Sequence, residues 1–298
     1  MKKILVVGSL NMDQVTKVKH TPKVGETING EGLELIPGGK GANQAVAMAK
    51  IGANVTMIGM VGADDFGKQL KDNITAMGVN DKVTITEKAP TGTALIMVNE
   101  SSDNSIVVIA GANGLLKPEH VKSEWFENID IVVLQLEIPI DTVNEIAIQA
   151  KSKGKFVVLN PSPATSLSDK ILSLVDLLVV NETEFESLSG IVFESEDSLA
   201  KGYEELGVKQ LIVTLGTKGS WYYDKTHKYF VPALIVDAVD TTAAGDSYMG
   251  ALVCELAKDE SIDKAMDLAT KVAAYTVTKL GAQTSLPTLK DLKERGLI

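Results

Sequence analysis

The segment Asp240-Thr241-Thr242-Ala243-Ala244-Gly245-Asp246 places a carboxylate beside a run of small residues. A helix is expected over residues 246–258, so the uncovered backbone amides of Ala243, Ala244 and Gly245 would lie at its N-terminal end, where anions bind. Asp246 could then act as a general base that takes a proton from a hydroxyl group while the amides hold a transferring phosphoryl group. The alternative is an ordinary acidic residue in the first turn of a helix.

A second segment, Gly38-Gly39-Lys40-Gly41-Ala42-Asn43-Gln44-Ala45, leads into an expected helix over residues 42–50. Adjacent glycines let the backbone approach a ligand closely, and the polar side chains of Lys40, Asn43 and Gln44 favour a ligand over a simple capping turn. A dinucleotide fingerprint fits poorly, because Gln44 stands at the place of its third glycine and no strand leads directly in. A Walker A loop is excluded, because no Gly-Lys-Ser or Gly-Lys-Thr occurs.

Polar residues also follow several expected strands. Asn11 and Asp13 come shortly after the first strand, and Glu137 follows a later one. Residues 181–184 and 214–219 follow two more. In doubly wound sheets, ligands bind beyond the carboxyl ends of the strands, so these side chains are expected at one active site.

The elements that must position these residues are short apolar runs that alternate with amphipathic stretches. This alternation predicts a doubly wound α/β fold, a mostly parallel sheet with helices on both faces. No repeat or linker divides the chain, so residues 1–298 are expected to form one domain. Strands are expected at 4–7, 55–59, 129–136, 156–159, 177–180 and 211–215, and helices at 65–77, 139–153, 197–206 and through most of 246–280.

Two regions break the alternation. Residues 14–37 have no helical period, and residues 93–109 indicate a hairpin with strands at 94–99 and 105–109 around a polar turn at 100–104. Together they predict a small β-sheet beside the main body. It could be a lid over the site, since both regions adjoin the glycine-rich segments, or surface decoration.

The composition excludes several classes of protein. The 298 residues are 45% hydrophobic, which argues against disorder, and no run approaches the roughly 18 apolar residues of a membrane helix. A net charge of −10, from 29 basic and 39 acidic residues without a dense basic block, argues against nucleic-acid binding. The single cysteine, Cys254, fits a reducing cytoplasm, and its apolar context predicts core packing. The three histidines are scattered and predict neither a catalytic triad nor a metal site.

The two glycine-containing segments resemble, in order and spacing, the two hallmark motifs of the ribokinase, or phosphofructokinase-B, family of sugar and nucleoside kinases. The resemblance covers essentially the whole chain, and residues 39–47 follow the form of the first motif found in the family's ribose kinases. It implies phosphorylation of D-ribose at O5 by ATP, giving ribose 5-phosphate and ADP. It also implies a β-sheet lid, at about residues 14–37 and 93–109, that often pairs two subunits into a homodimer.

The resemblance assigns roles to individual residues. Asp246 would be the base toward the 5-hydroxyl, and the sugar would be bound by Asn11, Asp13, Gly39, Lys40, Asn43 and Glu137. ATP would lie against Asn181, Thr214, Leu215, Gly216, Thr217, Lys218, Gly219, Ala243, Ala244 and Gly245. Magnesium would be organised through water by Glu184, and a monovalent cation, normally potassium, would be bound by Asp240, Thr242, Thr276, Lys279, Gly281 and Ser285. One departure is Thr270, where family members often carry an asparagine near the adenine.

Other functions remain alternatives. The sugar could be deoxyribose or fructose, or the acceptor could be a nucleoside, although polar contacts with little aromatic surface favour a small sugar over a stacked base. A sugar-sensing protein without catalysis would need neither Asp246 nor its anion hole. A lyase or glycosidase sharing the fold is disfavoured by the intact segment 240–246, and residues 276–285 could be merely a helix end and a turn.

Overall fold

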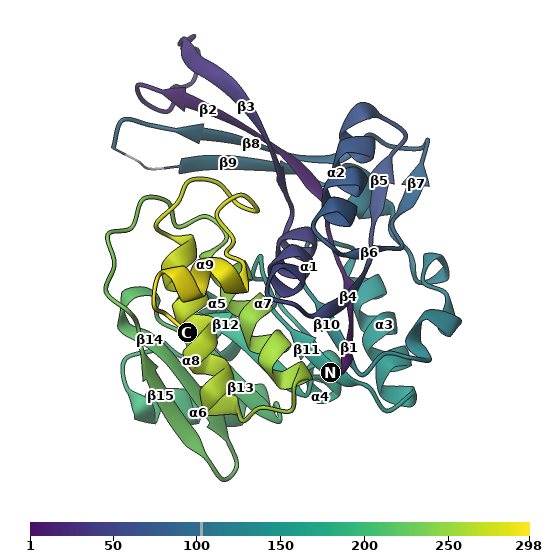
Figure 1. Ribbon diagram of the computed structural model, residues 1–298, viewed down its shortest axis with the longest axis vertical. Helices are drawn as coiled ribbons and strands as arrows, with labels where there is room; N and C mark the ends of the chain where they lie inside the picture. Colours follow the sequence, from purple (N-terminus) through teal and green to yellow (C-terminus); the bar gives the residue numbers. More distant parts are fainter. Residues whose placement is uncertain (102–103) are drawn as a thin grey trace.

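A nine-stranded sheet forms the centre of the molecule (Figure 1). The structure is a computed structural model that describes residues 1–101 and 104–298. The strand order is β15-β14-β13-β12-β11-β10-β1-β4-β6, parallel from β13 to β6 and antiparallel at β14 and β15. Its strands are β1 (Lys3–Val7), β4 (Asn54–Ile58), β6 (Asn80–Asp81), β10 (Ile131–Leu134), β11 (Phe156–Leu159), β12 (Leu177–Asn181), β13 (Gln210–Thr214), β14 (Gly219–Asp224) and β15 (Lys228–Pro232).

Helices connect and cover these strands. The α-helices are α1 (Lys40–Lys50), α2 (Asp65–Ala76), α3 (Ile140–Ser152), α4 (Asp169–Leu174), α5 (Glu182–Ser189), α6 (Glu196–Leu206), α7 (Ala244–Ala257), α8 (Ile262–Thr276) and α9 (Leu289–Glu294). Short 3-10 turns lie at Gly111–Leu115, Pro118–His120, Ser123–Phe126 and Gly216–Lys218, and β5 (Met60–Gly62) pairs with β7 (Thr84–Thr86). In the described part of the chain, no helix has the length and apolar character needed to cross a bilayer.

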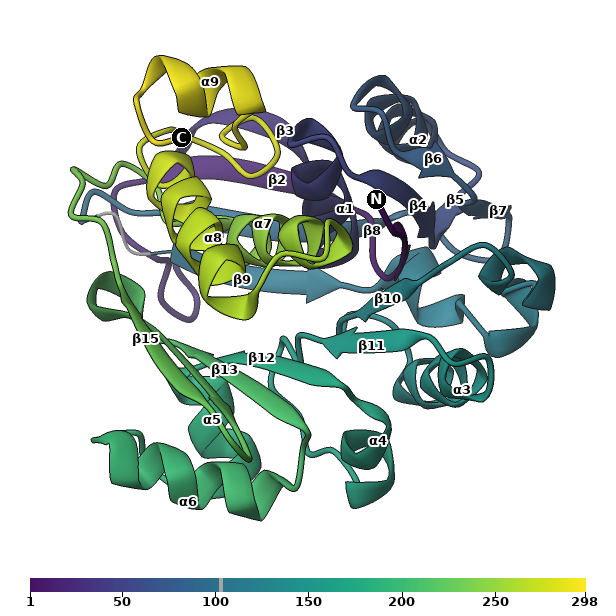
Figure 2. The ribbon, with the colours of Figure 1, turned by 60° about the horizontal axis from the view of Figure 1, so that its bottom comes forward.

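The hydrophobic core has two layers, one on each face of the sheet. In β1, Ile4 and Val6 belong to the layer shared with α1, α7 and α8, whereas Leu5 and Val7 belong to the layer shared with α3 and α6. Figure 2 shows the two groups of helices on opposite faces. Because the central strands β1, β10, β11 and β12 are buried on both sides, they are continuously apolar rather than alternating, which is the signal that the sequence carries. The predicted doubly wound α/β class is confirmed.

The sheet extends further than the sequence pattern predicts. After β13 the chain turns back through β14 and β15, which form an antiparallel hairpin at the edge of the sheet. The glycine turn at residues 216–219 therefore ends in a strand. At the other boundaries the differences are small: β10 covers residues 131–134 instead of 129–136, and α7 begins two residues earlier than expected.

A second, four-stranded sheet lies beside the main body (Figure 1). Its order is β3-β2-β8-β9, formed by β2 (Asn11–Val18), β3 (Gly30–Gly38), β8 (Gly92–Val98) and β9 (Asn104–Ile109). These strands come from the two regions for which the sequence predicts a small sheet. Residues 102–103 of the expected polar turn lie outside the described residues. Since β2 follows β1 after three residues, this sheet begins at the carboxyl ends of the main strands.

Candidate active site

Asp246 lies in the first turn of α7 and follows a segment in which one residue, Ala243, has a left-handed backbone conformation. Ala243 caps the helix with φ 59°, a left-handed conformation that costs a non-glycine residue about 1–2 kcal/mol. Such strain is concentrated at functional sites, where the surrounding structure maintains it. At Gly245, an added Cβ would meet nothing within 4 Å, so the space beside this first turn is open. The start of α7 can therefore receive an anion, as the small residues predict.

The two motifs identified in the sequence meet at this carboxylate. Helix α1 packs against α7, and Asn43 Nδ2 donates to Asp246 Oδ2 at 3.0 Å. Gln44 Nε2 donates to Asp246 Oδ1, also at 3.0 Å. Asp246 is only 7% exposed, so these donors fix the carboxylate in one orientation. Each oxygen retains lone-pair capacity for a further proton or hydroxyl group.

The start of α1 is pressed against the carboxyl end of β1. Gly39 has φ +88°, and an added Cβ there would lie 2.7 Å from the backbone nitrogen of Asn11, so the position requires glycine. Glu137 Oε2 accepts from the backbone nitrogen of Lys40 at 3.0 Å and from Ser9 Oγ at 2.6 Å. These contacts bring the three segments predicted to bind the sugar into one corner of the molecule.

Electrostatics couples the acidic groups in this corner. Burial raises the pKa of Asp13 to about 7, and the nearby charges of Glu137 and Asp246 add to the shift. Burial of Lys40 alone would lower its pKa, but the carboxylates of Asp246, Glu137 and Glu184 outweigh burial and leave it raised. Lys40 therefore remains a cation among several carboxylates, whereas Asp13 can exchange a proton near neutral pH.

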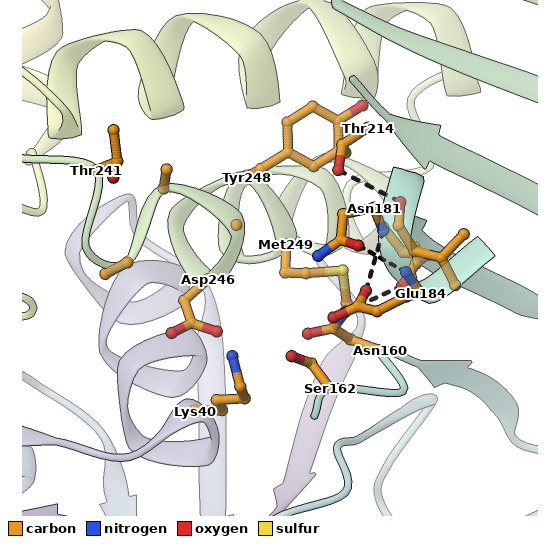
Figure 3. A pocket seen from close by; sticks show the side chains of 15 residues that line it. Lys40, Asn160, Ser162, Asn181, Glu184, Thr214, Thr241, Asp246, Tyr248 and Met249 are labelled. Atoms are coloured by element: carbon orange, nitrogen blue, oxygen red, sulfur yellow. Dashed lines mark hydrogen bonds between the residues drawn. The ribbon is translucent and has the colours of Figure 1, made fainter. Parts of the chain in front are cut away.

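A pocket of about 220 Å³ opens beside Asp246 (Figure 3). Lys40 and Asp246 stand on one side of it, and Asn160, Asn181 and Glu184 stand on the other. Thr241, Ala243, Ala244 and Gly245 supply the lining at the start of α7. The pocket thus combines amide donors, a cation and carboxylates at the carboxyl edge of the sheet, which suits a phosphate-bearing ligand with a metal ion.

The Asn181–Glu184 pair forms a capping box at the start of α5. Glu184 N donates to Asn181 Oδ1 at 2.8 Å, and Asn181 N donates to Glu184 Oε2 at 3.0 Å. The pair therefore has a structural role, since it satisfies two backbone donors of the helix. Glu184 is only 5% exposed and still lines the pocket, so its carboxylate also faces the ligand space.

The turn that follows β13 contributes less to the pocket than expected. Thr214 lines it and pairs in register with Asn181 on the neighbouring strand. Leu215 is 4% exposed and belongs to the core, while Gly216, Thr217, Lys218 and Gly219 lie beyond the pocket lining. Lys218 forms an exposed ion pair with Glu182 at 3.1 Å. The turn is thus adjacent to the pocket, and contact with a longer ligand stays a prediction.

The residues predicted to bind potassium converge in part. Asp240 Oδ1 accepts from Thr242 N and its Oδ2 accepts from Gly281 N, both at 2.8 Å, so the loop before α7 is tied to the segment after α8. Burial would raise the pKa of Asp240, but these hydrogen bonds lower it overall. Thr276 and Ser285 direct their hydroxyl groups to neighbouring carbonyls, and Lys279 turns its ammonium toward the Tyr275 ring. Lys279 could therefore offer a cation only its backbone.

Several site residues were not identified from the sequence. Asn113 clamps the start of β2, since its Nδ2 donates to Leu10 O and to Asn11 Oδ1 and its Oδ1 accepts from Leu10 N. Gln135 and Gln283 donate to Gln44 and Asn43, the two residues that hold Asp246. Gln135 lies two residues before Glu137, at the end of an expected strand, and this position is the signal by which the sequence could have identified it.

Comparisons with known proteins agree with this geometry. Residues 1–289 match the model of the pfkB family of carbohydrate kinases. The ribokinase of Haemophilus influenzae is 40% identical over 98% of this chain and 98% of its own length. The deoxyribokinase of Salmonella typhi is 37% identical over 98% of this chain and 97% of its own length. The structure of Arabidopsis thaliana ribokinase complexed with ribose and ATP superimposes with a TM-score of 0.91, at 32% identity over 98% of both chains.

Proposed function

Because this chain belongs to the pfkB family of carbohydrate kinases, we propose that it transfers the γ-phosphoryl group of ATP to O5 of D-ribose, giving ribose 5-phosphate and ADP. One observation carries the proposal: Asp246 is fixed by two amide donors beside the open first turn of α7, in a pocket suited to phosphate. A hydroxyl group there could lose its proton to Asp246 while the helix amides and Lys40 stabilise the phosphoryl group. Curated ribokinases that are 40% and 38% identical to this chain support ribose as the acceptor.

The site divides between two substrates in this proposal. The sugar lies in the corner that contains the polar side chains of Asn11, Asp13, Lys40, Asn43 and Glu137 and the backbone of Gly39. ATP lies in the pocket between α7 and β12, against Asn181, Thr214 and the residues 243–245. The complex of the Arabidopsis protein with ribose and ATP supports this pair of ligands.

We also propose Mg²⁺ as the cofactor that accompanies ATP. The residues fit it, because the buried carboxylate of Glu184 faces the pocket and Mg²⁺ prefers oxygen ligands while keeping several waters. Glu184 would hold the ion through water, and the ion would neutralise charge on the transferring phosphates. A cytoplasmic location is proposed with it, consistent with the single cysteine.

Potassium is expected to activate the enzyme strongly, and lithium only weakly. The ionised Asp240 joins two chain segments whose carbonyl and hydroxyl oxygens are suitable ligands for a large monovalent cation. A cation there would shape the neighbouring anion hole at the start of α7. Initial rates measured in sodium-free buffer, with potassium, lithium or a large organic cation as the sole monovalent ion, test this proposal. Equal rates in all three would refute the site.

Deoxyribose is the second candidate acceptor, because a curated deoxyribokinase is 37% identical over nearly the whole chain. The two sugars differ by one hydroxyl group, and a site that binds this group discriminates strongly against its absence. Fructose and nucleosides are the further alternatives within the same chemistry. A sensing protein without catalysis is disfavoured, because binding alone does not require a carboxylate held beside an anion site, as Asp246 is.

A coupled assay of ADP release distinguishes these candidates. Ribose, 2-deoxyribose, fructose and adenosine are each supplied over a concentration series, with ATP, Mg²⁺ and potassium present. We expect the highest kcat/KM for ribose, and a product whose phosphate is at O5 by NMR. Turnover that is highest on another acceptor would replace the substrate, and no turnover on any of them would reject the kinase.

The second sheet is proposed to pair two copies of the chain. Its surface exposes apolar side chains of β8 and β9: Leu95 is 40% exposed and its partner in register, Val107, is 54% exposed. Ile106 and Val108, on the same edge strand, are also about half exposed. Exposed apolar side chains on an edge strand are costly unless another chain covers them.

Val107→Lys is therefore expected to shift the protein from dimer to monomer in sedimentation velocity, because a charge would be buried in the interface. Val192→Lys is the matched control, since Val192 is similarly exposed, at 52%, and lies outside the second sheet, in the segment between α5 and α6. The control should keep the wild-type mass. A wild-type protein that is monomeric at micromolar concentration would contradict the pairing.

A further inference from the structure

The two amides that hold Asp246 are themselves held by two further amides. Gln135 Nε2 donates to Gln44 Oε1 at 2.6 Å, and Gln283 Nε2 donates to Asn43 Oδ1 at 3.1 Å. Gln135 is fully buried and Gln283 is 3% exposed. They reach the site from the end of β10 and from the segment after α8. Two pairs of amides, Gln135–Gln44 and Gln283–Asn43, here called the two arms, thus converge on the Asp246 carboxylate.

The order of donors along each arm follows from the carboxylate. An ionised Asp246 only accepts, so Asn43 and Gln44 must both turn their NH₂ groups toward it. Their carbonyl oxygens then point away from Asp246 and need donors of their own. Gln135 and Gln283 supply these donors, which makes the opposite orientation of each inner amide unfavourable.

The outer ends of the two arms differ. Gln283 Oε1 accepts from Asn73 Nδ2 at 2.6 Å, so this arm is satisfied. Among the described residues, no donor reaches Oε1 of Gln135, and an added Cβ on Gly8 would lie only 2.1 Å from that oxygen. A buried acceptor without a donor costs stability. Gly8 leaves room for this oxygen because it has no side chain. The Gln135 amide can therefore keep its Nε2 group directed at Gln44.

We infer that Gln135 and Gln283 are positioning residues that act through Gln44 and Asn43 to hold the Asp246 carboxylate in the orientation that receives the proton of the acceptor hydroxyl. The inference rests on the proposed function, since it deepens the role of Asp246 as the base. Neither residue lines the pocket, so both would affect the substrates only indirectly, through Gln44 and Asn43.

Gln135→Glu gives a test with a distinctive pH dependence. While the introduced carboxyl group is protonated, it carries one O–H that can donate to Gln44 Oε1 and preserve the arm. Once this group is ionised it only accepts, so Gln44 must turn its NH₂ group toward it and present Oε1 to Asp246. The ratio of the variant's kcat to the wild-type kcat is therefore expected to fall at least tenfold as pH rises from 6 to 9. Gln283→Glu should act in the same direction through Asn43.

Two further variants separate positioning from general damage. Gln135→Met removes the donor without adding a titratable group, so its kcat ratio should be lowered and independent of pH. Gln149→Glu adds the same carboxylate on α3, where the Gln149 side chain donates to Glu145 on its own helix, and its ratio should stay near one. KM for ATP should change less than kcat in every variant, although Gln44 also donates to Asn160 in the pocket lining. The charged groups facing Asp246, namely Lys40 of α1, Asp13 of β2 and Glu137 after β10, are present in every variant, so the pH dependence that they cause on their own also appears in Gln135→Met.

A readout without substrate keeps this inference separate from the proposed function. The side-chain NH₂ resonances of Gln44, assigned by their loss in Gln44→Met, should be displaced in Gln135→Glu as pH rises and unmoved in Gln149→Glu. Resonances and kcat ratios that do not respond to pH in either Gln135→Glu or Gln283→Glu would overturn the positioning role. Wild-type protein that phosphorylates no sugar while these resonances do respond would overturn the proposed function alone.

Discussion

Asp246→Asn is expected to lower kcat by about 10²–10⁴-fold while ribose and ATP still bind, because the variant keeps the shape of the side chain and loses the base. The structure adds a second cost. Asp246 accepts one hydrogen bond at each oxygen, from Asn43 and from Gln44. An asparagine has one oxygen, so its NH₂ group would face one of these two donors. Steady-state kinetics give kcat, and isothermal titration with ribose and with a non-hydrolysable ATP analogue gives the two affinities.

Asp65→Asn is the matched control for this variant. Asp65 is also the acidic residue in the first turn of a helix, α2, but it is exposed and lies outside the pocket. Its loss should leave kcat within about twofold of wild type, since surface substitutions of this kind are usually small in effect. If Asp246→Asn retained near-wild-type kcat, another group would have to take the proton.

Much of the fold could be predicted because the central strands are buried on both sides. The run at 156–159 was predicted with the bounds that β11 has in the structure, since a continuous apolar run between a helix and a polar turn has few other interpretations. The β14–β15 hairpin was missed for the opposite reason. Its strands alternate, with Trp221 and Tyr223 on one side and Tyr222 on the other, so they lack the continuous apolar run by which the central strands are identified.

The local part of the site was also predictable, whereas the part built by distant contacts was not. Spacing and residue type singled out Asp246 and the small residues before it. Nothing local indicates that Asn43 accepts from Gln283, 240 positions away, or that Gln135 holds Gln44 across 91 positions. Amide side chains can face either way, so only the assembled neighbours decide which end donates. The proton exchange of Asp13 likewise depends on burial, which spacing does not report.

Asp13→Ala is expected to raise KM for ribose by well over tenfold, because it removes a charged acceptor of sugar hydroxyl groups whose hydrogen bonds are worth roughly 1.5–3 kcal/mol. KM for ATP should hardly change, since Asp13 lies in the sugar corner and outside the pocket assigned to the nucleotide. Isothermal titration with each ligand separates the two effects. Weakened ATP binding with unchanged ribose binding would show that the N-terminal segment had been assigned to the wrong substrate.

The pKa of Asp13 adds a dependence on pH. Burial, reinforced by Glu137 and Asp246, raises this pKa to about 7, so the carboxyl group is protonated below pH 7 and loses its full capacity as an acceptor. The wild-type KM for ribose should therefore increase as pH falls from 8 to 6, whereas Asp13→Asn, which cannot titrate, should show a high KM with no such increase.

Stability should respond to the same group in the opposite sense. The folded protein without sugar holds the proton of Asp13 more tightly than the unfolded chain, whose aspartates titrate near pH 4, so between about pH 4 and 7 the contribution of Asp13 to the free energy of unfolding decreases as pH rises. Asp13→Asn removes the titrating group. The free energy of unfolding of this variant should therefore be about 1–4 kcal/mol higher than that of the wild type at pH 8, and nearly the same at pH 4. Urea denaturation at the two pH values measures the difference. An equal stability of variant and wild type at pH 8 would mean that the folded protein does not hold the Asp13 carboxylate against an electrostatic cost.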